Sequence, residues 1–168
     1  ASRTDWNGNL AQFTNDSRGL ETLRVEAAGT PQERRISTEW HSTFRLPTRI
    51  AEPLRITTHV YGDPNDPNPG NRGNVLSKTV QATSDANGAQ GFAGSAVGAP
   101  RTWTYTYSAN GQVLTVDGPR NDVPDVTTYT YFPDNDPDLG KRGNVASITN
   151  ALGHVTQITS YNAHGQPL

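Results

Sequence analysis

The sequence predicts an all-β protein built from tandem antiparallel hairpins. The clearest observation is that residues 101–107 alternate threonine with aromatic residues, so Trp103, Tyr105 and Tyr107 lie on one face of a strand and the threonines on the other. Asn110-Gly111 then tolerates the positive φ angles of a tight turn, and a β-branched run follows at residues 112–116. The second observation is that weaker copies of this strand-turn-strand unit account for most of the remaining chain.

The copies recur with a period of roughly twenty residues once inserted loops are removed. They comprise residues 55–61 followed by 73–76, residues 125–131 followed by 143–145, residues 154–161 followed by 162–166, and a degenerate copy at 34–40. In the degenerate copy, Trp40 takes the place of the tyrosine that ends the first strand.

A tyrosine that closes a threonine-rich strand, a short polar turn and then Gly-(Asn/Gln)-(Val/Leu) resembles the YD repeats of RHS (rearrangement hotspot) proteins. The most similar stretches are residues 116–120, 143–154 and 160–165, and the resemblance extends from about Leu54 to Leu168. The family's usual Tyr-Asp pair is absent, since the tyrosines are followed by Gly62, Ser108, Phe132 and Asn162. The resemblance implies a β-ribbon that spirals into a shell around a C-terminal effector, in a secreted or cell-surface bacterial protein.

The chain divides into a degenerate lead-in over residues 1–53 and the repeats proper over 54–168, with loops inserted at 62–73, 84–100 and 132–143. Within the lead-in, residues 20–27 are compatible with a strand or a short amphipathic helix, and a strand is expected because the neighbouring segments are strands. Residues 34–40 and 42–46 are expected to form a strand pair with a wide turn around His41. Proline cannot donate to a ladder, so Pro47 and Pro53 place the segment between them at a sheet edge or in a connection.

The composition is lean for a compact core, with 32% hydrophobic residues and a mean hydropathy of −0.70. A repeat array tolerates this because each hairpin buries its apolar face against its neighbours. The formal charge of −2 offers no basic stripe for nucleic acid, and no apolar run is long enough to span a membrane. The absence of cysteine excludes disulfides and thiol chemistry. The chain has no Met and no evident cap after Leu168, which is typical of a piece of a longer protein.

Two of the inserted loops share one design at an offset of 70 residues and raise the question of calcium. Oxygen ligands at alternate positions of a tight loop are how calcium loops wrap an ion. The candidate ligands are Asp134, Asp136 and Asp138 in the second loop and Asp63 and Asp66 in the first. The alternative is that Asp, Asn, Pro and Gly are simply good turn formers, with Arg72 or Arg142 pairing locally with a carboxylate.

The third loop, residues 84–100, is rich in small residues and is interpreted as a long exposed hairpin tip. Phe92 and Val97 either pin this loop to its own sheet or anchor a partner.

No motif supports catalysis, although His41, His59, His154 and His164 are available. His59 takes a repeat position filled elsewhere by tyrosine, His164 takes a turn position, and His41 has no repeat explanation. A non-enzymatic, structural role without a cofactor is therefore expected.

The repeat aromatics are expected to stack across neighbouring strands in the core. They are Tyr61, Trp103, Tyr105, Tyr107, Tyr129, Tyr131 and Tyr161. The alternative is that they form an exposed platform for sugar rings, which would make the protein a carbohydrate- or cell-surface-binding module. Bare ladder edges invite pairing with another chain, so the isolated protein is expected to self-assemble.

Overall fold

The structure, a computed structural model, describes all residues 1–168 and contains one antiparallel sheet of twelve strands. The strands are β1 (Ser2–Thr4), β2 (Leu10–Asn15), β3 (Glu21–Glu26), β4 (Arg34–Trp40), β5 (Pro47–Glu52), β6 (Arg55–Tyr61), β7 (Val75–Thr83), β8 (Ala96–Tyr107), β9 (Val113–Asp117), β10 (Thr127–Tyr131), β11 (Val145–Thr149) and β12 (Val155–Gln157). Short 3-10 turns lie at η1 (Pro69–Asn71) and η2 (Gly91–Ala93). The all-β prediction is confirmed.

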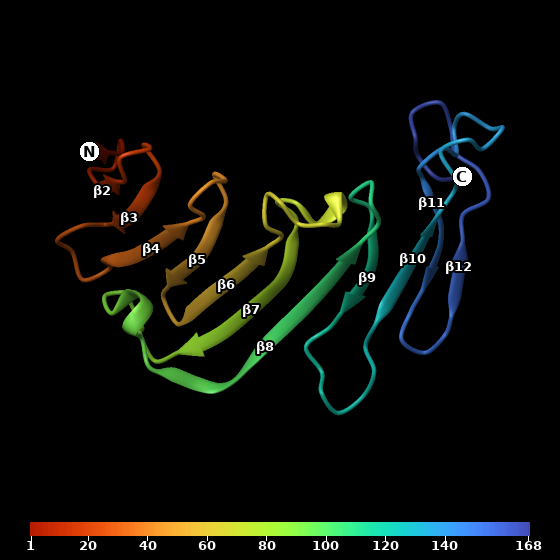
Figure 1. Ribbon diagram of the computed structural model, residues 1–168. Helices are drawn as coiled ribbons and strands as arrows, with labels where there is room; N and C mark the ends of the chain where they lie inside the picture. Colours follow the sequence, from red (N-terminus) through yellow and green to blue (C-terminus); the bar gives the residue numbers. More distant parts are fainter.

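The order of strands in the sheet follows the sequence from β1 to β12, so each strand pairs with its neighbours in the chain. Figure 1 shows the result as an open, curved band that runs from the N-terminus to the C-terminus. The outer sides of β1 and β12 are therefore free ladder edges.

The sheet is a single layer with little interior. Only 9 of the 168 residues are buried, and the accessible surface is 10406 Å². A compact protein of this mass would expose about 8,100 Å². The excess surface shows that both faces of the sheet are open over most of their area, as the lean composition predicts.

A β-bulge recurs at the same place in five of the hairpins. The register shifts by one residue just before Asn15, Trp40, Tyr61, Tyr107 and Tyr131. In each case the extra residue lies second in the following strand, as Leu76 does opposite Tyr61 and Leu114 opposite Tyr107. A bulge strengthens the local right-handed twist, so the recurring bulge curves the band in the same sense at each of these five hairpins.

The loop between β7 and β8 differs from the exposed tip expected over residues 84–100. Residues 96–100 belong to β8, and the preceding residues fold back onto the face of β4 and β5. The Arg49 guanidinium lies 4.3 Å from the centroid of the Phe92 ring, and the Arg35 amide donates to the Asn87 carbonyl. Asp85 is only 4% exposed. Phe92 thus pins the loop to its own sheet, whereas Val97 is half-exposed.

Residues 47–53 also differ from the expected edge or connection. Residues 47–52 form β5, an interior strand between β4 and β6, while residues 42–46 are a loop and not a strand. Pro47 is tolerated because it is the first residue of the strand and lies at the bulge opposite Trp40. Pro53 lies in the two-residue turn to β6, where Leu54 takes a φ of 64°.

Candidate functional site

The repeat aromatics form a continuous row along the strand ends. Four aromatics that end a strand, and Tyr161 just beyond β12, donate from the ring to the carbonyl of the first residue of the preceding strand, which for Tyr161 is β11. The five bonds are Trp40 Nε1 to Glu21 (2.8 Å), and the hydroxyls of Tyr61 to Pro47 (3.0 Å), Tyr107 to Val75 (2.7 Å), Tyr131 to Val113 (2.7 Å) and Tyr161 to Val145 (2.6 Å). Trp40 does stand in for the tyrosine, as its place in the degenerate copy predicts.

The row links each hairpin to the one before it. The acceptor residue Val113 is the register partner of Tyr107, and Val145 is the register partner of Tyr131. The bond from each tyrosine therefore ends at the residue opposite the previous aromatic. A carbonyl freed by the bulge would otherwise lack a partner, and the ring supplies one.

The rings do not stack on one another as expected. The ring pairs in the chain involve His41, Phe44, His59 and Tyr61 and no two consecutive repeat aromatics. The cross-strand partner of Tyr105 is instead Val116, and that of Tyr129 is Ile148. An aromatic ring beside a β-branched side chain is a favourable cross-strand pair.

Burial raises the pKa of Tyr61, and burial with a smaller contribution from a neighbouring tyrosine raises the pKa of Tyr107 and Tyr131. These three phenols stay protonated well into the alkaline range. They are thus available as hydrogen-bond donors at physiological pH.

The two faces of the sheet differ in chemistry, as the alternation of threonine and aromatic residues predicts. On the threonine face, hydroxyls pair across strands between Thr79 and Thr102 (2.9 Å), Thr106 and Thr115 (2.6 Å), and Thr130 and Ser147 (2.7 Å).

On the aromatic face, an open groove of about 570 Å³ crosses the strands from β6 to β11. The groove is lined by His59, Val75, Lys78, Tyr105, Tyr107, Val113, Val116, Tyr129, Tyr131 and Val145.

The turns between strands are held by a polar residue that follows the strand. The Asp16 carboxylate accepts the amides of Arg18 (2.8 Å) and Leu20 (2.9 Å), and Asn162 accepts those of His164 and Gln166 in the same way. The Leu20 amide, with Arg18, lowers the pKa of Asp16. Asp16 directly follows the last residue of β2, and Asn162 directly follows Tyr161, so the two acceptors lie at equivalent places in their hairpins.

In the structure, His41 occupies a turn position of the repeat, which the sequence did not reveal. Its Nδ1 atom accepts the amides of Thr43 and Phe44, both at 3.1 Å, so the imidazole replaces the aspartate as the turn acceptor. Its ring centroid lies 4.9 Å from that of Phe44 and 6.3 Å from that of Tyr61. The position directly after Trp40 is the signal that identifies this role.

The other histidines lie in separate places. His59 lines the groove at its β6 end, and its ring centroid is 6.0 Å from that of Tyr61. His154 and His164 lie in two exposed turns near the C-terminus.

The acidic side chains of the two similar loops are engaged by the loops themselves. Asp66 accepts the Asn68 amide (2.9 Å) and Asp136 accepts the Asp138 amide (2.9 Å), while Asp138 accepts the Gly140 amide (2.9 Å). Asp63 accepts the Asn65 amide, and Asp134 accepts from the Asn110 side chain.

The arginines of these loops bond to backbone oxygens rather than to the carboxylates that the turn-forming alternative proposed. Arg72 donates to the Asp66 carbonyl and Arg142 to the Asp136 carbonyl. The structure contains no group of three or more His, Asp or Glu side chains that could hold a metal. Calcium binding by these loops stays a prediction, which a calcium titration followed by circular dichroism would test.

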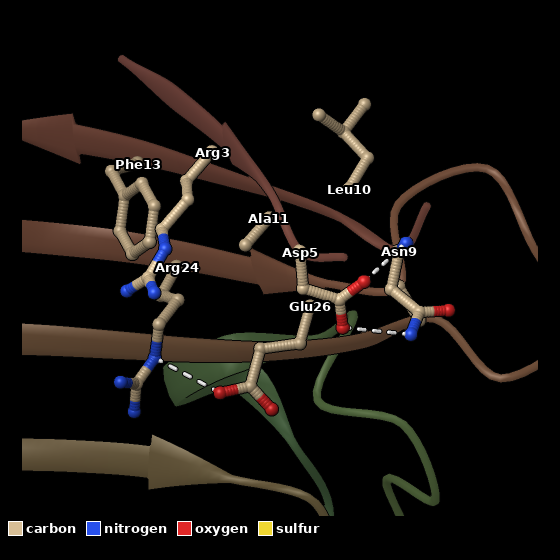
Figure 2. Close-up of a pocket in the computed structure, with 9 residues that line it drawn as sticks. Arg3, Asp5, Asn9, Leu10, Ala11, Phe13, Arg24 and Glu26 are labelled. Atoms are coloured by element: carbon tan, nitrogen blue, oxygen red, sulfur yellow. Dashed lines mark hydrogen bonds and ion pairs between the residues drawn. The ribbon is translucent and has the colours of Figure 1, made fainter. Parts of the chain in front are cut away.

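A second cavity, of about 290 Å³, lies near the N-terminus and was not anticipated from the sequence (Figure 2). Arg24 Nε lies 3.3 Å from Glu26 Oε1, and the Asn9 side chain donates to Asp5 at 2.9 Å. Of the charged groups that line this cavity, Arg24 and Glu26 are thus paired with each other, while Asp5 bonds to the neutral Asn9 side chain. The only sequence signal is that Arg24 and Glu26 alternate with Val25 and so share a face.

The structure contains no helix with the length and apolar character that a membrane span requires.

Comparison by sequence finds no matching family model and no matching curated protein. Comparison by structure finds similar folds in Tc toxins. They are a crystal structure of TcdB2-TccC3-Cdc42 (TM-score 0.67, 16% identity), the Tc holotoxin pore of Photorhabdus luminescens with a TccC3 mutation (TM-score 0.63, 16% identity), and a crystal structure of TcdB2-TccC3-TEV (TM-score 0.56, 18% identity). Each match covers 99% of this chain and 8%, 8% and 9% of the solved chain, respectively.

The matched toxin chains are RHS-repeat proteins. Because the sequence identity is low, the comparison shows a similarity of fold alone. This similarity agrees with the resemblance that the tyrosine repeats indicate. The chain therefore shares the antiparallel β-fold of the matched part of these RHS-repeat toxin chains.

Proposed function

We propose that the chain is a non-catalytic wall segment of an RHS-type shell, which encloses a C-terminal effector in a secreted or cell-surface protein. The observation that carries this proposal is the single-layer sheet, whose twelve strands follow the sequence and whose two edges are free. A sheet of this kind can be extended at either end without rearranging the strands already present. The likeness to RHS-repeat toxin chains that are much longer than this one supports the proposal.

The free edges provide the means of extension. The Ile158 amide donates to the Ala146 carbonyl, so it points toward β11. Because the direction of amides alternates along a strand, the amides of Val155 and Gln157 point away from β11. In an isolated chain these groups, and those on the outer side of β1, are available to pair with a second copy.

Light scattering after size exclusion tests this step. The wild-type chain is expected to show a mass above 18.2 kDa that rises with protein concentration. Val155→Lys places a charge on the free edge strand and is expected to lower the mass toward that of the monomer.

Leu152→Lys is the matched control, because Leu152 is 80% exposed in the adjacent turn and lies outside the ladder. It is expected to leave the assembly unchanged. A monomer at every concentration, with a β-type circular dichroism spectrum in both variants, would contradict edge pairing.

A carbohydrate- or surface-binding module is the second candidate function. The observation that favours it is that none of the repeat aromatics is fully buried, so the rings on the groove face are partly open to solvent. Titration with oligosaccharides, followed by quenching of Trp103 and tyrosine fluorescence, tests this alternative. Saturable quenching supports a glycan site, and an unchanged spectrum contradicts it.

A further inference from the structure

We propose that the groove on the aromatic face binds an elongated amphiphile with one aliphatic chain and a carboxylate head group. This inference goes beyond the shell function and does not depend on it.

The shape of the groove fits a long ligand. Its lining residues come from six consecutive strands, β6 to β11. At the usual spacing between strands, six strands span about 24 Å. A volume of about 570 Å³ lies within the range of small-molecule sites in proteins. The groove is thus long and narrow, and it crosses the strands rather than running along them.

The polarity of the groove is arranged in two parts. From β8 to β11 the lining consists of valines and tyrosines, and the hydroxyls of Tyr107 and Tyr131 are already bonded to backbone carbonyls. Few polar groups are left there for a sugar, whose hydroxyls each need a partner. An aliphatic chain needs none, and it gains from contact with the apolar wall.

The one formally charged residue of the lining lies near the β6 end. Lys78 is the register partner of Trp103, and its ammonium group lies 5.9 Å from the centroid of a Trp103 ring. None of the eight ion pairs of the chain includes Lys78. The groove therefore offers an unpaired cation at one end and an apolar wall beyond it. An anionic head group followed by a single hydrocarbon chain complements both parts.

Isothermal titration calorimetry of the purified chain with dodecanoate, below the concentration at which it forms micelles, tests the proposal. We expect saturable binding of one molecule per chain. Dodecyltrimethylammonium carries the same chain with the opposite charge, and it is expected to bind at least tenfold more weakly because it meets Lys78. Equal binding of the two amphiphiles, or no saturable binding of dodecanoate, would overturn the proposal.

Two variants locate the site. Lys78→Gln is expected to weaken dodecanoate binding about tenfold, since it removes one charge-assisted contact. Lys141→Gln is the matched control, because Lys141 also lies over an aromatic ring, 5.2 Å from the centroid of Phe132, but outside the groove. It is expected to bind like the wild type. Equal effects of the two substitutions would place the ligand elsewhere and overturn the assignment.

Val116→Asp tests the apolar part independently by placing a carboxylate in the groove wall. We expect the loss of dodecanoate binding, provided that circular dichroism shows the wild-type β spectrum. If this variant folds and binds dodecanoate as tightly as the wild type, the chain does not lie in the groove. If it does not fold, the comparison of Lys78→Gln with Lys141→Gln decides the proposal alone.

Discussion

The tyrosine that ends a strand contributes a packed ring and a hydroxyl bond to the preceding strand, and these two contributions can be separated. Tyr131 and Tyr129 lie on the same strand and the same face, and both line the groove. Tyr131 donates to the Val113 carbonyl, whereas the Tyr129 hydroxyl has no bond within the protein.

Tyr131→Phe is expected to lower the free energy of unfolding by about 1 kcal/mol, because it removes the hydroxyl bond and leaves the ring in place. Tyr129→Phe is the matched control and is expected to change it by less than about 0.5 kcal/mol. Urea unfolding followed by circular dichroism measures both. Equal losses in the two variants would show that the bond to Val113 adds nothing to stability.

His59 makes the stability of the chain depend on pH. Burial of the imidazole, with the nearby Lys78 ammonium, lowers the pKa of His59 below its ordinary value of 6.5. Just below pH 6.5 the unfolded chain therefore binds a proton that the folded chain does not. Stability attributable to His59 is complete above pH 6.5 and is lost as the pH falls through the lower pKa of the folded state.

The urea midpoint is expected to fall between pH 8 and pH 5 in the wild type, and to fall less in His59→Tyr. Tyrosine fills the equivalent position at Tyr105 and Tyr129, so this substitution suits the repeat. His164→Asn, in an exposed turn, is the control and is expected to keep the wild-type pH dependence. A His59→Tyr variant with the wild-type dependence would assign the effect to other groups.

At the scale of elements, the loops before β7 and β11 share one design, but the first contacts its neighbouring turn more closely than the second. In the loop before β7, the Asn68 side chain donates to the Tyr107 carbonyl, and Gly70 is buried against the turn that follows β8. Asp138 takes the place of Asn68 in the second loop and cannot donate in the same way. Gly140, the counterpart of Gly70, has more space, since an added Cβ would lie 3.3 Å from the nearest atom.

Gly70→Ala is therefore expected to destabilise the protein by about 2 kcal/mol or more, because the new methyl group would overlap the Ser108 carbonyl oxygen. Gly140→Ala is expected to cost less than about 1 kcal/mol, since only the end of the Asp138 side chain must move. Thermal unfolding of the two variants measures the difference. Equal melting temperatures would mean that the first loop is not fixed to the β8 turn.

The elements that could be predicted from the sequence are those set by local pattern. The alternation at residues 101–107 and the aromatic at the end of each repeat determine the faces of the sheet and the position of Trp40 in the row. The fold-back of residues 84–95 could not be predicted, because it depends on Arg49 and Arg35, which lie far away in the sequence. The prediction that Pro47 marks a sheet edge or a connection was wrong for a related reason. A bulge opposite Trp40 makes proline acceptable in an interior strand.

The candidate site was predicted less completely than the fold. The alternation in the sequence predicts which residues lie on the aromatic face. It does not predict the bonds from the tyrosine hydroxyls to the preceding strand, because the accepting carbonyls lie at the bulges. A bulge leaves no clear mark in the sequence, since the extra residue is Thr48 in one hairpin, Leu114 in another and Ala146 in a third. The expected ring stacking is absent because Tyr105 and Tyr129 lie opposite aliphatic residues, Val116 and Ile148, in the register of the sheet.

At the scale of the whole molecule, burial is concentrated in the first half of the band. Seven of the nine buried residues lie between Ala51 and Gly88, and none lies beyond Gly88. The fold-back of residues 84–95 supplies this local second layer. Strands β9 to β12 lack such a layer, and they are held by their neighbours, by the row of tyrosines and by side-chain bonds between turns, such as Asn110 to Asp134 and Gln112 to Gly143.

Amide hydrogen exchange is expected to be slowest in β5, β6 and β7 and at least tenfold faster in β10 to β12, because the terminal hairpins can open without disturbing the buried region. Mass spectrometry of peptic fragments at one pH measures this gradient on a sample kept dilute enough to remain monomeric. Uniform protection from β1 to β12 would indicate that the band unfolds as a single cooperative unit.

The bulge that precedes each strand-ending aromatic determines how the band can lengthen by gene duplication during evolution. Because curvature is produced within the bulged hairpins, duplicating one of them in the gene lengthens the band while leaving its bend unaltered. Loops such as residues 63–72 can expand at the turns without entering the ladder. A lineage can thus adjust the length of the band in discrete steps, by copy number alone, with no need to redesign a core.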